Sequence, residues 1–95
     1  MRLSAADRAA IVEEVRRLDR EARVRLYGSR ADDAARGGDL DLLVISDQLG
    51  FRDQIRLRIG ILDRIGWQQL DLVLRRTNEQ DEPLAATALA SGIRL

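Results

Sequence analysis

The chain has 95 residues, and its 16 arginines balance 16 acidic residues, so that the formal net charge is zero. Lysine, histidine and cysteine are absent. These absences exclude disulfide bonds, zinc sites built on Cys or His, cysteine nucleophiles and histidine general bases. The balanced charge gives no overall positive field that would indicate nucleic-acid binding. Any chemistry must therefore use carboxylates, hydroxyls and arginines.

The length predicts a single domain over residues 1–95. A domain of this size buries only about two-thirds of the surface of its unfolded chain, so a deep, closed site is not expected. No segment approaches the ~20 consecutive apolar residues of a membrane span. The N-terminal segment carries charge throughout and lacks the apolar centre of a signal peptide. We therefore expect a cytoplasmic protein that does not bind membranes.

Apolar residues at helical spacing predict a first helix over residues 4–20, and alternation of apolar with polar residues predicts a first strand over residues 22–27. A short helix is expected over residues 29–36. Gly37-Gly38 should end it, because glycines permit the positive φ angles of a C-cap and turn. Residues 39–46 form the most apolar strand, which should be central in the sheet.

After residues 47–50, a loop in which Asp47 is available as a cap, a helix is expected over residues 51–65. Its apolar side is predicted to consist of Phe51, Ile55, Ile59, Leu62 and Ile65. Trp67 opens a third strand over residues 67–74, and Pro83 lies in the first turn of a last helix that ends at Ser91-Gly92. Residues 93–95 add a short edge strand. The order helix-strand-helix-strand-helix-strand-helix predicts an α/β (α+β) fold.

Two acidic residues, Asp39 and Asp41, open the central strand. Side chains alternate between the faces of a strand, so these carboxylates project side by side. Like charges held that close favour a cation between them, and Mg²⁺ takes carboxylate oxygens together with substrate phosphates. Gly28-Ser29 lies between the first strand and the short helix, where free backbone N–H groups can hold a phosphate. Metal and phosphate would meet at one edge of the sheet.

These residues resemble a known family. Gly28-Ser29, nine intervening residues and then Asp39-Leu40-Asp41 followed by Leu42-Leu43-Val44 resemble the signature of DNA polymerase beta-type nucleotidyltransferases. The similarity is greatest to the minimal, MNT-type domain that is often paired with a HEPN protein, and it covers nearly the whole chain. The commoner spacing in the family is one or a few residues longer. The resemblance implies a small mixed β-sheet of three to four strands with helices packed on it.

A third acidic residue, Asp71, is flanked by leucines in the third strand and so lies on the face opposite to them, as Asp41 does. In the resembled family, two aspartates of the first motif bind two metal ions, and a third joins them and helps to activate the attacking hydroxyl. The resemblance implies that Asp39 and Asp41 are the two metal-binding aspartates of the first motif. It implies that Asp71 is the third aspartate, which joins them at the metal ions and helps to activate the hydroxyl. Two metals about 4 Å apart stabilise both the attacking and the leaving oxygen.

Nucleotide binding is predicted at Gly28, Ser29, Arg30 and Arg36. Ser29 would hold the β- and γ-phosphates through its hydroxyl and backbone N–H, and the two arginines are candidates to offset triphosphate charge, although either is also compatible with an exposed surface position. Tyr27 could stack on a base or accept a nucleotidyl group, but an aromatic residue on a half-buried strand usually packs. Trp67 is expected to contact the core or a partner. We assign neither aromatic residue a catalytic role.

Each motif also has a purely structural interpretation. Gly28-Ser29 alone is an ordinary turn, and Asp39-Leu40-Asp41 after two glycines is frequent turn chemistry. Asp71 alone can be an edge charge that discourages aggregation. Their occurrence together, in order and on compatible strand faces, favours the nucleotidyltransferase.

The resemblance implies an enzyme that uses two Mg²⁺ ions to move a nucleoside monophosphate, AMP from ATP, onto a hydroxyl with release of pyrophosphate. The domain is too small to enclose both nucleotide and acceptor, so a partner should complete the site in a homo- or hetero-oligomer. The resemblance implies a HEPN-type toxin, modified on a tyrosine, with this chain as antitoxin. One alternative is a catalytically silent antitoxin that covers its partner. A weaker alternative is an antibiotic nucleotidyltransferase, against which the missing substrate domain argues.

Overall fold

The computed structural model describes residues 1–34 and 38–95. The described residues form three α-helices, four strands and two single 3-10 turns. The helices are α1 (Ala5–Leu18), α2 (Phe51–Ile65) and α3 (Pro83–Ser91). The strands are β1 (Arg23–Tyr27), β2 (Leu40–Ile45), β3 (Leu70–Arg75) and β4 (Ile93–Arg94), and the turns are η1 (Gly28–Ala31) and η2 (Thr77–Glu79). No helix in these two ranges is long and apolar enough to span a membrane.

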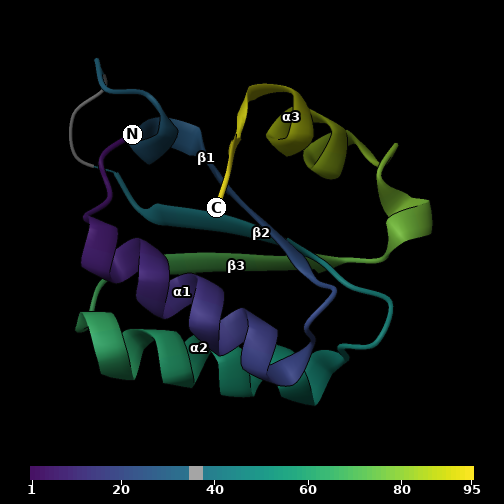
Figure 1. Ribbon diagram of the computed structural model, residues 1–95. Coiled ribbons are helices and arrows are strands. Elements are labelled where there is room, and N and C mark those ends of the chain that lie inside the picture. The colour runs from purple at the N-terminus through teal and green to yellow at the C-terminus, as the bar shows by residue number, and fades with distance from the viewer. Residues whose placement is uncertain (35–37) are drawn as a thin grey trace.

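The strands form one mixed sheet in the order β3-β2-β1-β4, which confirms the predicted fold class. β2 and β3 are parallel, and β1 is antiparallel to both β2 and β4. β2 is central, as its sequence predicted, and all of its residues except Asp41 are buried. Helices α1 and α2 lie side by side on one face of the sheet, and α3 covers part of the other face (Figure 1).

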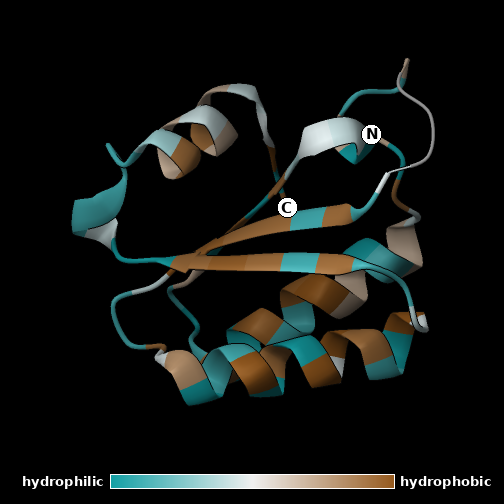
Figure 2. Ribbon diagram, turned by 180° about the vertical axis from the view of Figure 1, so that it is seen from behind, coloured by the Kyte–Doolittle hydropathy of each residue, from teal (hydrophilic) through white to brown (hydrophobic). Residues whose placement is uncertain are grey.

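Each face of the sheet buries its own set of apolar side chains. The main core lies between the sheet and α1 and α2, and it includes Leu26, Leu42 and Leu72. A smaller cluster lies under α3 and includes Leu43 and Ala88. Neighbouring residues of β2 therefore face different helices, because side chains alternate along a strand. Both faces of the central strand are consequently apolar along most of its length (Figure 2).

The helix expected over residues 29–36 is wrong over its described part. Only the single 3-10 turn η1 forms, and the chain leaves it at Asp32. The Asp32 carboxylate accepts a hydrogen bond from the backbone N–H of Ala34 at 2.9 Å. Short polar side chains that bond to the backbone in this way compete with helix formation. Residues 35–37, which include the predicted site residue Arg36, lie outside the described residues.

The predicted apolar side of α2 is also wrong in part. The bounds of the helix agree with the prediction, but Phe51, Ile55 and Ile59 have 77%, 44% and 62% of their surface exposed. The fully buried residues of the helix are Leu57 and Ile61. Leu62 and Ile65 of the predicted side are half-buried and pack against the main core, as expected. The helix thus carries two apolar stripes, and long-range packing decides which of them is buried.

Two further local predictions fail around α2. Asp47 does not cap the helix, because its carboxylate accepts hydrogen bonds from the backbone N–H and the hydroxyl of Thr77 at 2.9 and 2.7 Å. Gly50 precedes the helix instead, and its N–H donates to Asp53. Trp67 lies before β3 rather than in it and is 80% exposed, so it does not contact the core.

Candidate active site

Acidic side chains meet where β1 ends and where β2 and β3 begin. Asp41 and Asp71 are partners in the parallel register of β2 and β3, and Tyr27 is the partner of Asp41 in β1. Partners in register project from the same face, so these three residues form one row across the sheet, on the face that α3 partly covers. Asp39 directly precedes β2, and both Asp39 and Asp71 are exposed. The structure therefore brings Asp41 and Asp71 together, with Asp39 at the rim.

The turn η1 lies against this row. Gly28 has a φ of +73°, and a Cβ atom at this position would lie 2.3 Å from Oδ2 of Asp41. Gly38 has a φ of +94°, and a Cβ atom there would lie 1.8 Å from Oγ of Ser29. Both glycines are needed for space as well as for backbone conformation. The Gly28-Ser29 turn is thus packed directly beside the Asp41 carboxylate.

The N-terminal segment holds the turn in place. The guanidinium of Arg2 donates to the carbonyl of Ser29 at 3.0 Å, and the backbone N–H of Arg2 donates to the carbonyl of Arg30 at 2.8 Å. The expected helix dipole is missing, since η1 is a single turn. Any phosphate bound here would therefore depend on the hydroxyl and backbone N–H of Ser29 rather than on a helix terminus.

The electrostatics of the row favour a bound cation. Burial raises the pKa of the Asp41 carboxyl above its ordinary value, and the negative charges of Asp71 and then Asp39 raise it further. The pKa of Tyr27 is raised by burial first and then by Asp71 and Asp41, whereas Arg75 lowers it. The row thus concentrates negative charge that a cation would relieve.

A comparison with protein families identifies the domain. The family model "Nucleotidyltransferase domain" matches residues 8–91, a range that contains the Gly28-Ser29 turn and all three carboxylates. The chain belongs to this nucleotidyltransferase family. Membership indicates nucleotidyl transfer, for which domains of this family generally use a nucleoside triphosphate and a divalent metal.

One solved structure supports this assignment at the level of the fold. A crystal structure described as that of a "putative nucleotidyltransferase" has a TM-score of 0.67 and 20% sequence identity, over 96% of this chain and 99% of the other. Another, described as a "putative nucleotidyltransferase from Sulfolobus solfataricus", has a TM-score of 0.45 and 14% identity, over 99% of this chain and 89% of the other. No curated protein matches the chain significantly.

The nucleotidyltransferase site has two features that the sequence analysis missed. The hydroxyl of Tyr27 is buried and has no hydrogen-bond partner among the described residues. Arg75 lies four residues after Asp71 in β3 and pairs with Glu82, whose carboxylate also caps α3 at Leu84 and Ala85. The period of two in β3 could have placed Arg75 on the same face as Asp71.

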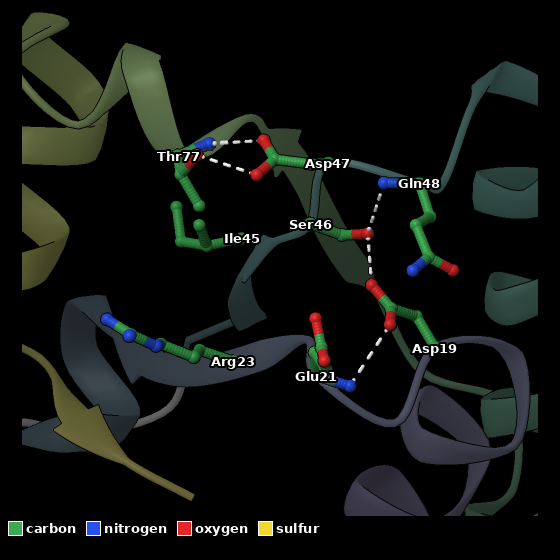
Figure 3. Close-up of a pocket in the computed structure, with 8 residues that line it drawn as sticks. All are labelled: Asp19, Glu21, Arg23, Ile45, Ser46, Asp47, Gln48 and Thr77. Atoms are coloured by element: carbon green, nitrogen blue, oxygen red, sulfur yellow. Dashed lines mark hydrogen bonds between the residues drawn. The ribbon is translucent and has the colours of Figure 1, made fainter.

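The cavity shown in Figure 3 lies at the other end of the strands. It has a volume of about 300 Å³ and lies beside the start of β1 and the end of β2. Two of its three acidic side chains, Asp19 and Asp47, are engaged within the protein. The buried Asp19 carboxylate accepts hydrogen bonds from the Ser46 hydroxyl at 2.6 Å and from the backbone N–H of Glu21 at 3.0 Å. Asp47 is held by Thr77 in the same way. These hydrogen bonds hold the loop after β2, and the cavity is separate from the carboxylate row.

The donor set of the row fits a hard divalent cation. Its carboxylates supply the oxygen ligands that Mg²⁺ prefers. Within residues 1–34 and 38–95, no group of three or more His, Cys, Asp or Glu side chains is arranged so that it could hold a metal ion by itself. Mg²⁺ commonly takes one or two carboxylates and completes its shell with water and substrate phosphates, which suits a pair such as Asp41 and Asp71.

Proposed function

We propose that this nucleotidyltransferase transfers AMP from ATP to a hydroxyl group of a partner protein and that it uses Mg²⁺ for the reaction. The partner is a HEPN-type toxin, and the chain acts as its antitoxin. The single observation that carries the proposal is the register of β2 and β3, which holds Asp41 beside Asp71 next to the Gly28-Ser29 turn.

The residues of the row have distinct roles in the proposed reaction. The hydroxyl oxygen of the acceptor forms a bond to the α-phosphorus of ATP while the bond from this phosphorus to the bridging oxygen breaks, and pyrophosphate leaves. Asp71 receives the proton of the acceptor hydroxyl. Ser29 binds the β- and γ-phosphates, and Arg30, half-buried in η1, offsets their charge. Arg36 remains a proposed second arginine at this site.

Divalent cations would be held by Asp41 and Asp71 together with water and substrate phosphates, and Asp39 at the rim remains a proposed further ligand. When bound, they would supply charge stabilisation at the attacking and leaving oxygens. The raised pKa of Asp41 supports this assignment, because burial first and then the charges of Asp71 and Asp39 disfavour the ionised carboxyl, and a bound cation would offset this cost.

A partner protein is proposed because the row is open. Asp39 and Asp71 are exposed, and α3 covers only part of the sheet face. Exclusion of water strengthens electrostatic stabilisation in an active site. A macromolecular acceptor that presents its hydroxyl over the row would provide this cover.

A transfer assay tests the proposal. The chain, Mg²⁺, α-phosphate-labelled ATP and the protein encoded by the neighbouring gene are incubated, and the label on that protein is measured. We expect labelled partner with the unmodified chain and at least a 100-fold lower rate with Asp41→Asn or Asp71→Asn, because each removes a ligand oxygen charge. Asp63→Asn, which changes an exposed carboxylate of α2, is the matched control and should leave the rate unchanged.

The same assay with all four nucleoside triphosphates separates the enzyme from the alternatives. If no triphosphate labels the partner, while the Asp41→Asn variant still neutralises the toxin fully, the chain is a silent antitoxin that acts by binding. If a small hydroxylated antibiotic is labelled in preference to the protein, the acceptor class is wrong.

A further inference from the structure

The exposed side of α2 carries an apolar stripe that the fold leaves largely uncovered. Phe51, Ile55 and Ile59 are exposed, and Leu62 is half-buried because it also packs against the main core. Their spacings of four, four and three residues place the four side chains on one side of the helix. We refer to these four residues as the α2 stripe. Such rows of large apolar side chains mark interaction sites. The α2 stripe faces away from the carboxylate row, because α2 covers the opposite face of the sheet (Figure 1).

We infer that the α2 stripe binds a second copy of this chain, with the two α2 helices antiparallel about a two-fold axis at the level of Leu57. Ile55 and Ile59 lie two residues before and after Leu57. Phe51 and Leu62 lie at similar distances from it, near the two ends of the helix. An antiparallel partner would therefore place Ile55 against Ile59 and Phe51 against Leu62, a self-complementary arrangement.

The charges beside the α2 stripe favour the same arrangement. Asp63 follows Arg52 by eleven residues, close to three helical turns, so both lie on the same flank of the helix. In the antiparallel dimer, this flank of one helix lies beside the same flank of the other helix. The N-terminal end of each helix lies beside the C-terminal end of its partner, so each Arg52 meets the partner copy's Asp63. Within the described part of the chain neither residue forms an ion pair. In a parallel two-fold arrangement each flank would lie beside the opposite flank of the partner, so Arg52 and Asp63 would not meet.

The sheet edges disfavour the main competing mode of self-association, strand addition. The outward carbonyls of β3 are occupied: Arg58 donates to Leu70 at 2.5 Å, Gln54 donates to Leu72 at 2.6 Å, and Arg75 donates to Leu74 at 3.0 Å. At the other edge, the guanidinium of Arg8 donates to the carbonyl of Arg94 at 3.0 Å. Carbonyls bonded in this way are not free to accept hydrogen bonds from a further strand.

The α2 stripe suits a reversible dimer. Two copies, with their flanking charged side chains, would bury on the order of 1,000 Å² in total, which is the size class of weak complexes. The stripe and the carboxylate row lie on opposite sides of the sheet, so both active sites would stay open to an acceptor. The inference is independent of the proposed acceptor.

Sedimentation equilibrium of the full chain over about 1–500 µM tests the inference. We expect a monomer–dimer equilibrium that Ile59→Arg weakens at least tenfold. Ala86→Arg, which adds the same charge to the exposed side of α3, is the matched control and should not change it. Arg52→Asp and Asp63→Arg should each weaken the dimer, and the double variant should restore it. Each single exchange places a charge that suits the helix dipole, so unfolding cannot account for a loss of the dimer.

Three results would overturn the inference. The chain could remain monomeric over the whole concentration range, which would leave the α2 stripe for a different protein. The dimer could survive Ile59→Arg, which would place the interface elsewhere. The double charge exchange could fail to restore the dimer, which would exclude the antiparallel arrangement.

Discussion

Replacement of Asp41 by Asn removes the charge at the centre of the carboxylate row and keeps the shape of the side chain. Burial, Asp71 and Asp39 raise the pKa of Asp41 above the ordinary value of 3.8. A raised carboxyl pKa means that the folded state binds this proton more tightly than the unfolded state does. Stability then falls as the pH rises from 3.8 through the folded pKa, so ionised Asp41 destabilises the protein at neutral pH. Asp41→Asn should therefore be more stable than the unmodified chain.

The arrangement of the strands sets the size of this gain. Neighbouring strands lie about 4.8 Å apart, so the carboxylates of Asp41 and Asp71 repel one another over roughly 5 Å. Two unit charges at about 5 Å repel by ~0.8 kcal/mol in water and by ~3 kcal/mol at an effective dielectric constant of 20. Because Asp71 is exposed, solvent screening favours the lower value. We expect a gain of about 1 kcal/mol in the free energy of unfolding, or ~4–8 °C in Tm.

Thermal unfolding followed by circular dichroism, without divalent cations, measures the gain. It should be present at pH 8 and absent near pH 3, where Asp41 of the unmodified chain is protonated. Glu21→Gln, which removes an exposed carboxylate outside the helices and at the other end of β1, should show no gain at either pH. A variant less stable than the unmodified chain at pH 8, or a gain of equal size at pH 3, would refute the proposed repulsion.

The same two proteins test the cation. A ligand that binds only the folded state at ten times its dissociation constant stabilises it by about 1.4 kcal/mol. Mg²⁺ should therefore raise the Tm of the unmodified chain by several degrees and that of Asp41→Asn by much less. Equal shifts in both proteins would show that the cation binds away from the row.

Four other substitutions give stability predictions, each measured by urea unfolding. Gly28→Ala should lower the free energy of unfolding by about 3 kcal/mol, because φ is +73° and the added Cβ would lie 2.3 Å from a carboxylate oxygen of Asp41. Gly66→Ala should lower it by only about 1 kcal/mol, because φ is +92° but the added Cβ meets no atom within 4 Å. Ser46→Ala should cost about 2 kcal/mol, because it leaves the buried Asp19 carboxylate without a donor at Oδ2; a loss below 0.5 kcal/mol would contradict this. Tyr27→Phe should stabilise by about 1 kcal/mol, because it removes a buried hydroxyl that has no partner, and a clear loss would show that the hydroxyl is bonded.

The alternation of side chains along the strands was the most reliable basis for predicting the site from the sequence. The run Leu40–Ile45 carries a single charged residue, so it could only be a central strand, and a period of two was sufficient to place Asp41 opposite the leucines. The same period placed Asp71 on that face. Which strands are neighbours was not available from any local pattern. The parallel register of Asp41 with Asp71 depends on the path of the chain through α2, a long-range property.

The connection after β1 was predicted poorly because local bonds override propensity there. Residues such as Asp32 and Ala34 are compatible with a helix by composition, but the Asp32 carboxylate bonds to the backbone and stops it. The consequence for function is specific. A phosphate at Ser29 cannot rely on a helix dipole, so its affinity should depend on the hydroxyl and on the neighbouring arginine Arg30.

The incorrect prediction of which side of α2 is buried identifies an apolar surface of the protein. Two apolar stripes lie on one helix, and only contacts outside the helix select between them: Gln54 and Arg58 flank the stripe that contains Leu57 and bond to the edge carbonyls of β3. Once these bonds fix the rotation of α2, the other stripe must face outward. An amphipathic pattern indicates which side chains are to be buried away from water. It does not indicate whether they are buried by the same chain or by a second copy of the chain. The predicted apolar side is therefore consistent with the inferred dimer, in which a second α2 covers Ile55 and Ile59.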